Sequence, residues 1–186
     1  MPPSGPQWTN QFHASSSTDD LVEPFRGSVN SFLAALRSAG ATVNIAETLR
    51  PPQRVYLMHY SFCIAREALD PSAVPAMAGV DIQWVHTDAQ GNPDLPGSKA
   101  AAEQMVQAYG IVFKPALTSR HTQGRAIDMH IGWLGNLTIA NAAGDQTTIT
   151  TQPCTGSGNS ALQAVGAAYG VIKLVTDPPH WSDDGH

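Results

Sequence analysis

The chain has 186 residues, of which 42% are hydrophobic and only 13% are charged. This length allows one compact domain to bury a core without disulfides, and the composition is typical of a globular protein rather than a disordered chain. Acidic residues outnumber basic ones, 15 to 10, so the formal charge is −5 and no basic stripe is available for a phosphate backbone. Nucleic acid is therefore excluded as an expected partner.

The sequence also argues against a membrane protein. No stretch approaches the roughly 18 unbroken apolar residues of a membrane-spanning helix, so we expect a soluble protein. Residues 1–18 are rich in Pro, Ser and Thr and lack the basic and apolar regions of a secretory signal, which predicts a flexible tail. Two cysteines, Cys63 and Cys154, are too few for a disulfide framework or a cysteine-based zinc site.

The first part of the chain predicts two helices around one strand. A capping-box pattern at residues 17–20 precedes an apolar stripe of helical period, and Gly40 is a natural stop for that helix. Residues 42–48 alternate and are rich in β-branched side chains, which predicts a strand. A second helix is expected over residues 51–69, opened by two prolines. Arg50 would then lie at the corner between strand and helix.

The middle of the chain predicts a long loop followed by a helix. Residues 71–97 contain many Pro and Gly residues and one short apolar run, so we expect a loop with one strand over residues 80–85. A loop of this length in a compact domain is often a binding loop. Ser98 is expected to cap a helix that ends before Gly110, with a strand at residues 111–113 after it.

The last part predicts further strands and one helix. Residues 126–131 alternate as a strand, and residues 137–150 are typical of a hairpin. A helix over residues 159–169 and a strand over residues 171–175 complete the pattern. The fold class is therefore predicted to be α+β, a mostly antiparallel sheet flanked by helices, with residues 19–186 as a single domain.

Two segments contain side chains of the types that bind metal ions. His121 and Asp128 are seven positions apart, and Gly124 between them lets the chain turn. A second segment, near the carboxyl end, contains Asp177 and His180. Three protein ligands, His121, Asp128 and His180, with a fourth position left to water, are the pattern of a catalytic zinc ion. The sequence therefore predicts zinc as the cofactor.

These segments carry a family resemblance. Ser119, His121, Gly124, Ala126 and Asp128 match the pattern Ser-x-His-x-x-Gly-x-Ala-x-Asp, and Asp-x-x-His-Trp follows at residues 177–181. The chain resembles the D-alanyl-D-alanine carboxypeptidases and phage L-alanyl-D-glutamate endopeptidases, peptidoglycan metallopeptidases of the hedgehog/DD-peptidase fold. The resemblance covers mainly residues 111–131 and 171–181. It implies a zinc peptidase with His121, Asp128 and His180 as metal ligands.

The resemblance also implies roles for neighbouring residues. It assigns Asp177 as the catalytic carboxylate and Arg50, in Glu47-Thr-Leu-Arg50, as the cation that binds substrate over the metal. Asp rather than Glu at position 177, with Pro-His-Trp at residues 179–181, is more similar to the phage endopeptidases than to the dipeptidases. Val55 departs from the family, in which Gln often follows this Arg by a helical turn.

Three further residues are candidates for contacts with substrate or with the ligand loop: Ser119, Gln123 and Trp181. Ser119 and Gln123 lie beside ligands, and ligand loops need hydrogen bonds that hold their orientation. Trp181 follows His180 directly and is expected near the site. His130 is expected to share the cleft-facing side of its strand with Asp128.

Three functions remain open at this stage. An endopeptidase that cuts the stem or cross-link peptide of peptidoglycan is favoured; a D,D-carboxypeptidase and a zinc-binding pseudo-peptidase acting as a binding module are the alternatives. The expected substrate lies in the cell wall or periplasm. Without a signal peptide, delivery would depend on lysis, a holin-like pore or specialised secretion, and a secreted effector would have an immunity protein as partner.

Overall fold

The computed structural model describes residues 1–186, and its contacts divide the chain into two compact units. The first unit comprises Met1–His13 and Pro51–Ser119, and the second comprises Ala14–Arg50 and Arg120–His186. Each unit has a hydrophobic core of its own. Residues far apart in the sequence therefore fold together in each.

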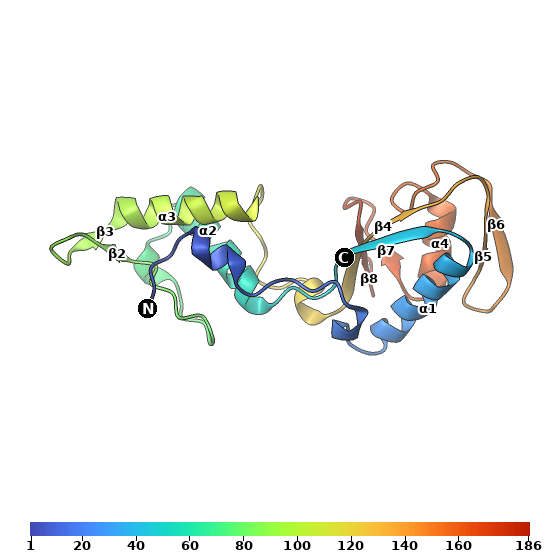
Figure 1. Cartoon of the computed structure of the whole chain (residues 1–186), viewed down its shortest axis with the longest axis horizontal. Coiled ribbons are helices and arrows are strands. Elements are labelled where there is room, and N and C mark those ends of the chain that lie inside the picture. Colours follow the sequence, from blue (N-terminus) through green and yellow to red (C-terminus); the bar gives the residue numbers. More distant parts are fainter. The chain divides into compact units, whose positions relative to one another are not determined.

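The second unit contains the main sheet (Figure 1). The strand order is β1-β4-β8-β7, and every neighbouring pair is antiparallel; β5 and β6 form a separate hairpin. Its elements are η2 (Thr18–Asp20), α1 (Phe25–Ser38), β1 (Thr42–Glu47), η4 (His121–Gln123), β4 (Ala126–Gly132), β5 (Leu137–Ala140), β6 (Gln146–Ile149), α4 (Ser160–Ala168), β7 (Ile172–Lys173) and β8 (His180–Ser182). The predicted α+β class with a mostly antiparallel sheet is confirmed.

Alternation along β4 gives the sheet two different faces. Ile127, Met129 and Ile131 are buried in one core together with apolar residues of α1 and α4, which lie beside the sheet in Figure 1. Side chains at even positions point to the opposite face, because successive residues of a strand alternate. Asp128 is therefore directed away from the helix-covered core.

The first unit is mainly helical. Its elements are η1 (Pro6–Asn10), α2 (Pro52–Arg66), η3 (Pro71–Ala73), β2 (His86–Thr87), β3 (Pro93–Asp94) and α3 (Leu95–Tyr109). Helices α2 and α3 pack against each other, and Trp8 is buried with them. The indole of Trp8 donates a hydrogen bond to the Pro3 carbonyl, and Trp8 itself accepts one from the Tyr109 hydroxyl. Residues 1–13 thus have defined contacts, unlike the flexible tail predicted for residues 1–18.

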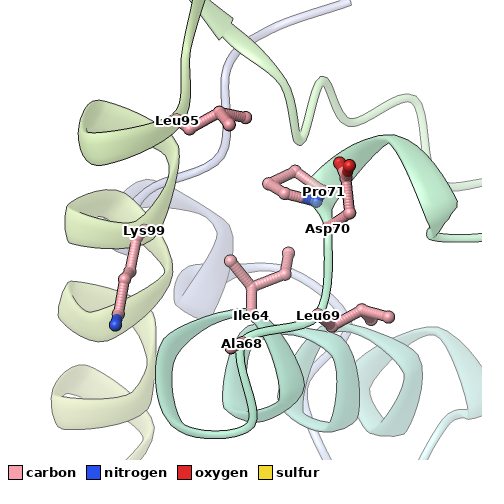
Figure 2. A pocket seen from close by; sticks show the side chains of 7 residues that line it. All are labelled: Ile64, Ala68, Leu69, Asp70, Pro71, Leu95 and Lys99. Atoms are coloured by element: carbon pink, nitrogen blue, oxygen red, sulfur yellow. The ribbon is translucent and has the colours of Figure 1, made fainter.

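A small pocket of about 290 Å³ opens between α2, η3 and the start of α3 in this unit (Figure 2). Ile64, Leu69 and Leu95 supply its apolar wall, and Asp70 and Lys99 supply charge.

None of the four α-helices combines the length and apolar character that spanning a bilayer requires.

Two helices begin at residues other than those expected. Ser17 does accept a hydrogen bond from the Asp19 amide, but it closes the short η2 turn, and α1 begins only at Phe25. Asp94, not Ser98, caps α3 by accepting from the Gly97 amide. The Ser98 hydroxyl is fully buried and instead donates to the Asp94 carbonyl.

The strand predictions were wrong at two places and incomplete at a third. Residues 80–85 form no strand, although Val80, Ile82 and Trp84 are buried in the first unit. Residues 111–113 form none either, and Phe113 is 84% exposed. Conversely, β8 was not expected, and it carries His180 into the sheet beside β4.

Candidate metal centre

Three neighbouring strands place polar side chains in one row. Asp128 pairs with Glu47 of β1 on one side and with His180 of β8 on the other. Residues paired across antiparallel strands project from the same face, so all three lie on the side opposite to the apolar core. The register of the sheet, more than any local sequence feature, brings His180 to Asp128.

His121 reaches the row from a tight turn. Gly124 ends η4 with φ +66°, a left-handed conformation that favours glycine. A Cβ at this position would lie 3.0 Å from the Asp20 carbonyl oxygen, and the Gly124 carbonyl accepts a hydrogen bond from the Val22 amide. The turn is therefore both sharp and tightly packed, which fixes the direction of the His121 side chain.

Three potential metal-ligand atoms form a nearly equilateral triangle. Nε2 of His121, Oδ1 of Asp128 and Nδ1 of His180 are each 3.1 Å from the other two. Ligand atoms at about 2.0–2.1 Å from one tetrahedral zinc ion would be separated by roughly 3.3 Å. The residues present can hold a metal ion.

The outer nitrogens of both histidines determine which nitrogen faces the triangle. His121 Nδ1 is 2.9 Å from the Thr48 carbonyl oxygen, and His180 Nε2 is 3.1 Å from the His186 carbonyl oxygen. A carbonyl oxygen only accepts, so each of these nitrogens carries the proton and the neutral ring has its lone pair on the other. Two lone pairs and a carboxylate oxygen thus converge, and one divalent cation can meet all three.

The electrostatics of the group keep the carboxylate ionised. Burial alone would raise the pKa of Asp128, but when both imidazoles are protonated in the absence of metal, their hydrogen bonds to the carboxylate hold that pKa well below its usual range. Burial would likewise lower the pKa of His121, yet the Asp128 carboxylate outweighs it and the pKa is raised. Asp128 is therefore available as an anionic ligand at neutral pH.

Arg50 lies three residues after β1 and forms a bidentate pair with Glu47, the last residue of that strand. Its Nε and Nη2 donate to the two carboxylate oxygens at 2.6 and 2.8 Å, and the two side chains are 26% and 17% exposed. Burial would lower the pKa of Arg50, but Glu47, Asp128 and Asp177 together raise it. The guanidinium is thus within the electrostatic reach of the metal group and of Asp177. The backbone amide of Arg50 donates a hydrogen bond to the His121 carbonyl.

Asp177 lies in the exposed loop between β7 and β8. Its amide donates to the Leu174 carbonyl, and its own carbonyl accepts from the His180 amide. The ammonium of Lys173 donates to the same Asp177 carbonyl. The loop that carries Asp177 is consequently anchored through its backbone, while the carboxylate projects from an exposed residue.

The other predicted contact residues have different environments. Trp181 is fully buried against Phe32 on the helix-covered face, so it packs the core instead of presenting a surface to substrate. Gln123 is exposed and accepts a hydrogen bond from Arg120. Ser119 is the last residue of the first unit, outside the unit that carries the metal group. His130 is exposed, two residues beyond Asp128 on β4.

Four contributors to the site were not foreseen: Thr48, Glu47, Lys173 and the acidic pair Asp183-Asp184. Arg120, directly before His121, pairs with both of these aspartates, which follow β8. This ion cluster ties the two ligand-bearing segments together. The only sequence signal was the clustering of charges at residues 120–125 and 183–184, which does not reveal their pairing.

No protein-family model and no curated protein matches the chain.

Proposed function

We propose that the second unit is the centre of a zinc-dependent peptidase that hydrolyses a peptide bond in bacterial peptidoglycan. The observation that carries this proposal is the triangle of His121, Asp128 and His180, whose ligands come from the patterns Ser-x-His-x-x-Gly-x-Ala-x-Asp and Asp-x-x-His-Trp. Helices on one face of an antiparallel sheet and a metal group on the other are compatible with the hedgehog/DD-peptidase fold. On this proposal the chain belongs to the D-alanyl-D-alanine carboxypeptidases and L-alanyl-D-glutamate endopeptidases.

The donor set favours zinc as the metal. Two imidazoles and one carboxylate are the ligand types of catalytic zinc in peptidases, where the fourth position is left for water. Imidazole-rich sites suit zinc better than magnesium or calcium, which prefer oxygen ligands. A zinc ion held here would supply Lewis acidity, which acidifies water and polarises the scissile carbonyl.

The protein's own groups would handle the proton and the developing charge. Asp177 would accept a proton from the attacking water and deliver it to the leaving amine. Arg50 would donate to the carbonyl oxygen as negative charge develops on it, and Glu47 holds the guanidinium in place for that task. Peptide hydrolysis then consumes one water and yields a new carboxylate and a new amine.

The pairing of Arg50 favours an endopeptidase over a D,D-carboxypeptidase. A carboxypeptidase must bind the free carboxylate of its substrate, which calls for a cation with charge to spare. The charge of Arg50 is already matched by Glu47 through two hydrogen bonds. Such a neutral couple suits a peptide carbonyl inside a stem or cross-link peptide better than a terminal carboxylate.

The test is digestion of purified peptidoglycan with the zinc-loaded protein and with the chelated protein, followed by mass spectrometry of the products. New amino termini at an internal position of the peptide, formed only with metal, are expected. Release of free D-alanine alone would support the carboxypeptidase. Metal binding without any release would favour a binding module and overturn the proposed reaction.

The proposed substrate places the action in the cell wall or periplasm. Phage lysis, a holin-like pore or specialised secretion would then bring the enzyme to its substrate, and an effector would need an immunity protein in the producing cell. Co-purification of a tightly bound partner from the native host would support the effector. Purification of the enzyme from a phage lysate without such a partner would support an endolysin.

A further inference from the structure

Lys173 is a buried cation behind the loop that carries Asp177 and His180. The residue is 7% exposed, at the end of β7. Its Nζ donates hydrogen bonds to the carbonyls of Leu174, Asp177 and His180. An ammonium group has three N–H donors, so these three carbonyls satisfy all of them.

The same three residues are joined by a closed ring of backbone hydrogen bonds. The Leu174 amide donates to His180, the His180 amide to Asp177, and the Asp177 amide to Leu174, at 3.1, 3.1 and 3.2 Å. Each carbonyl in the ring therefore accepts one amide and one ammonium hydrogen. Lys173 lies where the three carbonyls converge, and it neutralises their mutual repulsion.

The surroundings of Lys173 offer no other reason for a buried charge. No carboxylate lies within ion-pair distance of its Nζ. Burial lowers the pKa of Lys173, although Asp177 and Asp128 act to raise it, and the Trp181 ring lies 5.8 Å away. An unpaired buried ammonium is costly unless it is fully hydrogen-bonded. All three hydrogen bonds of its ammonium go to the carbonyls of residues 174, 177 and 180, which lie in the loop between β7 and β8 and at the start of β8.

We propose that Lys173 is a positioning residue, whose ammonium gathers three loop carbonyls and so sets His180 against the other two metal ligands and Asp177 against the metal. The part that concerns Asp177 rests on the proposed peptidase function, whereas the part that concerns His180 rests only on the metal group. Lys173 touches neither metal nor substrate; it acts through the ring of residues 174, 177 and 180.

The first test replaces Lys173 by Met, which keeps an unbranched side chain of nearly the same length and removes the ammonium group with its charge and donors. Titration of the metal-free protein with Co²⁺, followed by its visible absorption, should show metal affinity about 10- to 100-fold weaker, with an altered spectrum. Turnover of peptidoglycan should fall with KM little changed. Unchanged affinity, spectrum and turnover would overturn the proposal.

Asn159→Ala is the matched control for a loss of stability alone. Asn159 is also buried, and its side-chain amide donates to the carbonyls of Thr151 and Pro153 while its oxygen caps α4. It contacts none of the ligand residues. At temperatures where both variants are folded, Asn159→Ala should bind Co²⁺ as the wild type does. Equal weakening in both variants would mean that Lys173 only stabilises the fold.

Lys173→Arg separates charge from geometry. A guanidinium presents its donors in a flat fork, so it restores the charge without meeting three converging carbonyls. Metal affinity between that of wild type and Lys173→Met is expected. Full recovery in the Arg variant would show that charge alone matters and would overturn positioning by the ring.

A measurement on the wild-type protein decides the matter if Lys173→Met does not fold. In protein labelled with ¹⁵N-lysine, the ammonium hydrogens of Lys173 should exchange slowly enough to be seen by NMR at neutral pH, unlike those of the exposed Lys99 and Lys114. Zn²⁺ should shift this signal, because the His180 carbonyl is one of its acceptors. A signal that is absent, or indifferent to metal, contradicts the proposal.

The two proposals can fail separately. If the wild-type protein binds metal but releases nothing from peptidoglycan, the proposed function fails, and the metal affinities and NMR signal still judge Lys173. If the wild type cleaves peptidoglycan and Lys173→Met retains metal affinity and turnover, only the positioning role fails.

Discussion

The two ligand-bearing segments of the second unit are held in place by different means. His121 and Asp128 are positioned by the backbone that joins them: the left-handed Gly124, the packing of that glycine against Asp20, and the regular strand β4. His180 and Asp177 lie on a loop and a short strand whose geometry depends on the side chain of Lys173. The first segment is shaped mainly by backbone conformation, with one distant contact at Asp20, whereas the second is shaped by a side chain within it and by the pairing of β8 with β4.

The largest expected effect tests whether the two segments serve one metal. Asp128→Ala from the first and His180→Ala from the second should each abolish zinc binding, because neither leaves three ligands. Zinc at about 1,000 times its Kd would stabilise the wild type by about 4 kcal/mol, and both variants should lose this stabilisation. Metal analysis after dialysis and thermal unfolding with and without zinc measure the effect. A variant that retains stoichiometric zinc would remove that residue from the ligand set.

Asp177→Ala separates the proton-transfer role from the ligand role within the second segment. Proton transfer by a positioned side chain contributes about 10²–10⁴-fold, so peptidoglycan hydrolysis should fall by that factor with zinc content preserved. Turnover and metal content of the same preparation check this. Loss of zinc would make Asp177 a support for the metal. Full turnover would move the proton acceptor elsewhere, and His130 would be examined next.

Arg50 and Glu47 flank the first segment and should affect catalysis without affecting metal. Removing a donor to a developing oxyanion costs about 10²–10³-fold, which is the loss expected for Arg50→Ala. Glu47→Gln keeps the shape of its partner and should cost less, about tenfold, since it only loosens the guanidinium. Steady-state kinetics alongside zinc analysis distinguish the two. Wild-type turnover in Arg50→Ala would exclude it from the site.

The smallest expected effect concerns the turn at Gly124 in the first segment. Gly124 and Gly135 have nearly the same φ, +66° and +67°, but a Cβ meets backbone 3.0 Å away only at Gly124. Gly135→Ala should lower the free energy of unfolding by about 1 kcal/mol, the cost of a left-handed alanine. Gly124→Ala should lower it by a further ~1–2 kcal/mol because of the contact with Asp20. Urea denaturation compares them, and equal losses would mean that the close packing is easily relieved.

The same contrast explains what the sequence could and could not predict. Alternation along β4 indicated which of its side chains are buried, and the spacing of His121, Gly124 and Asp128 indicated a metal group, because these are properties of one continuous segment. The strand β8 was missed because three residues are too few for a periodic signal, and its pairing with β4 depends on distant parts of the chain.

Single residues show the same limit. Trp181 was expected near substrate because it follows His180, but adjacent residues of a strand face opposite sides, and once β8 exists Trp181 must point into the core. Lys173 drew no attention, since an isolated lysine is nearly always at the surface. The exposed Phe113 had been assigned to a strand on β propensity alone, without a partner strand to support it.

The two-sided alternation of β4 and β8 also has an evolutionary consequence. The odd-numbered Ile127 and Trp181 are buried in the core, while the even-numbered Asp128 and His180 belong to the metal group. Cores tolerate apolar replacements that conserve volume. A lineage of such proteins can therefore replace most of its helix-facing side chains and still inherit the ligands unmoved, so descent in this fold would be traced more securely through the polar positions than through overall sequence likeness.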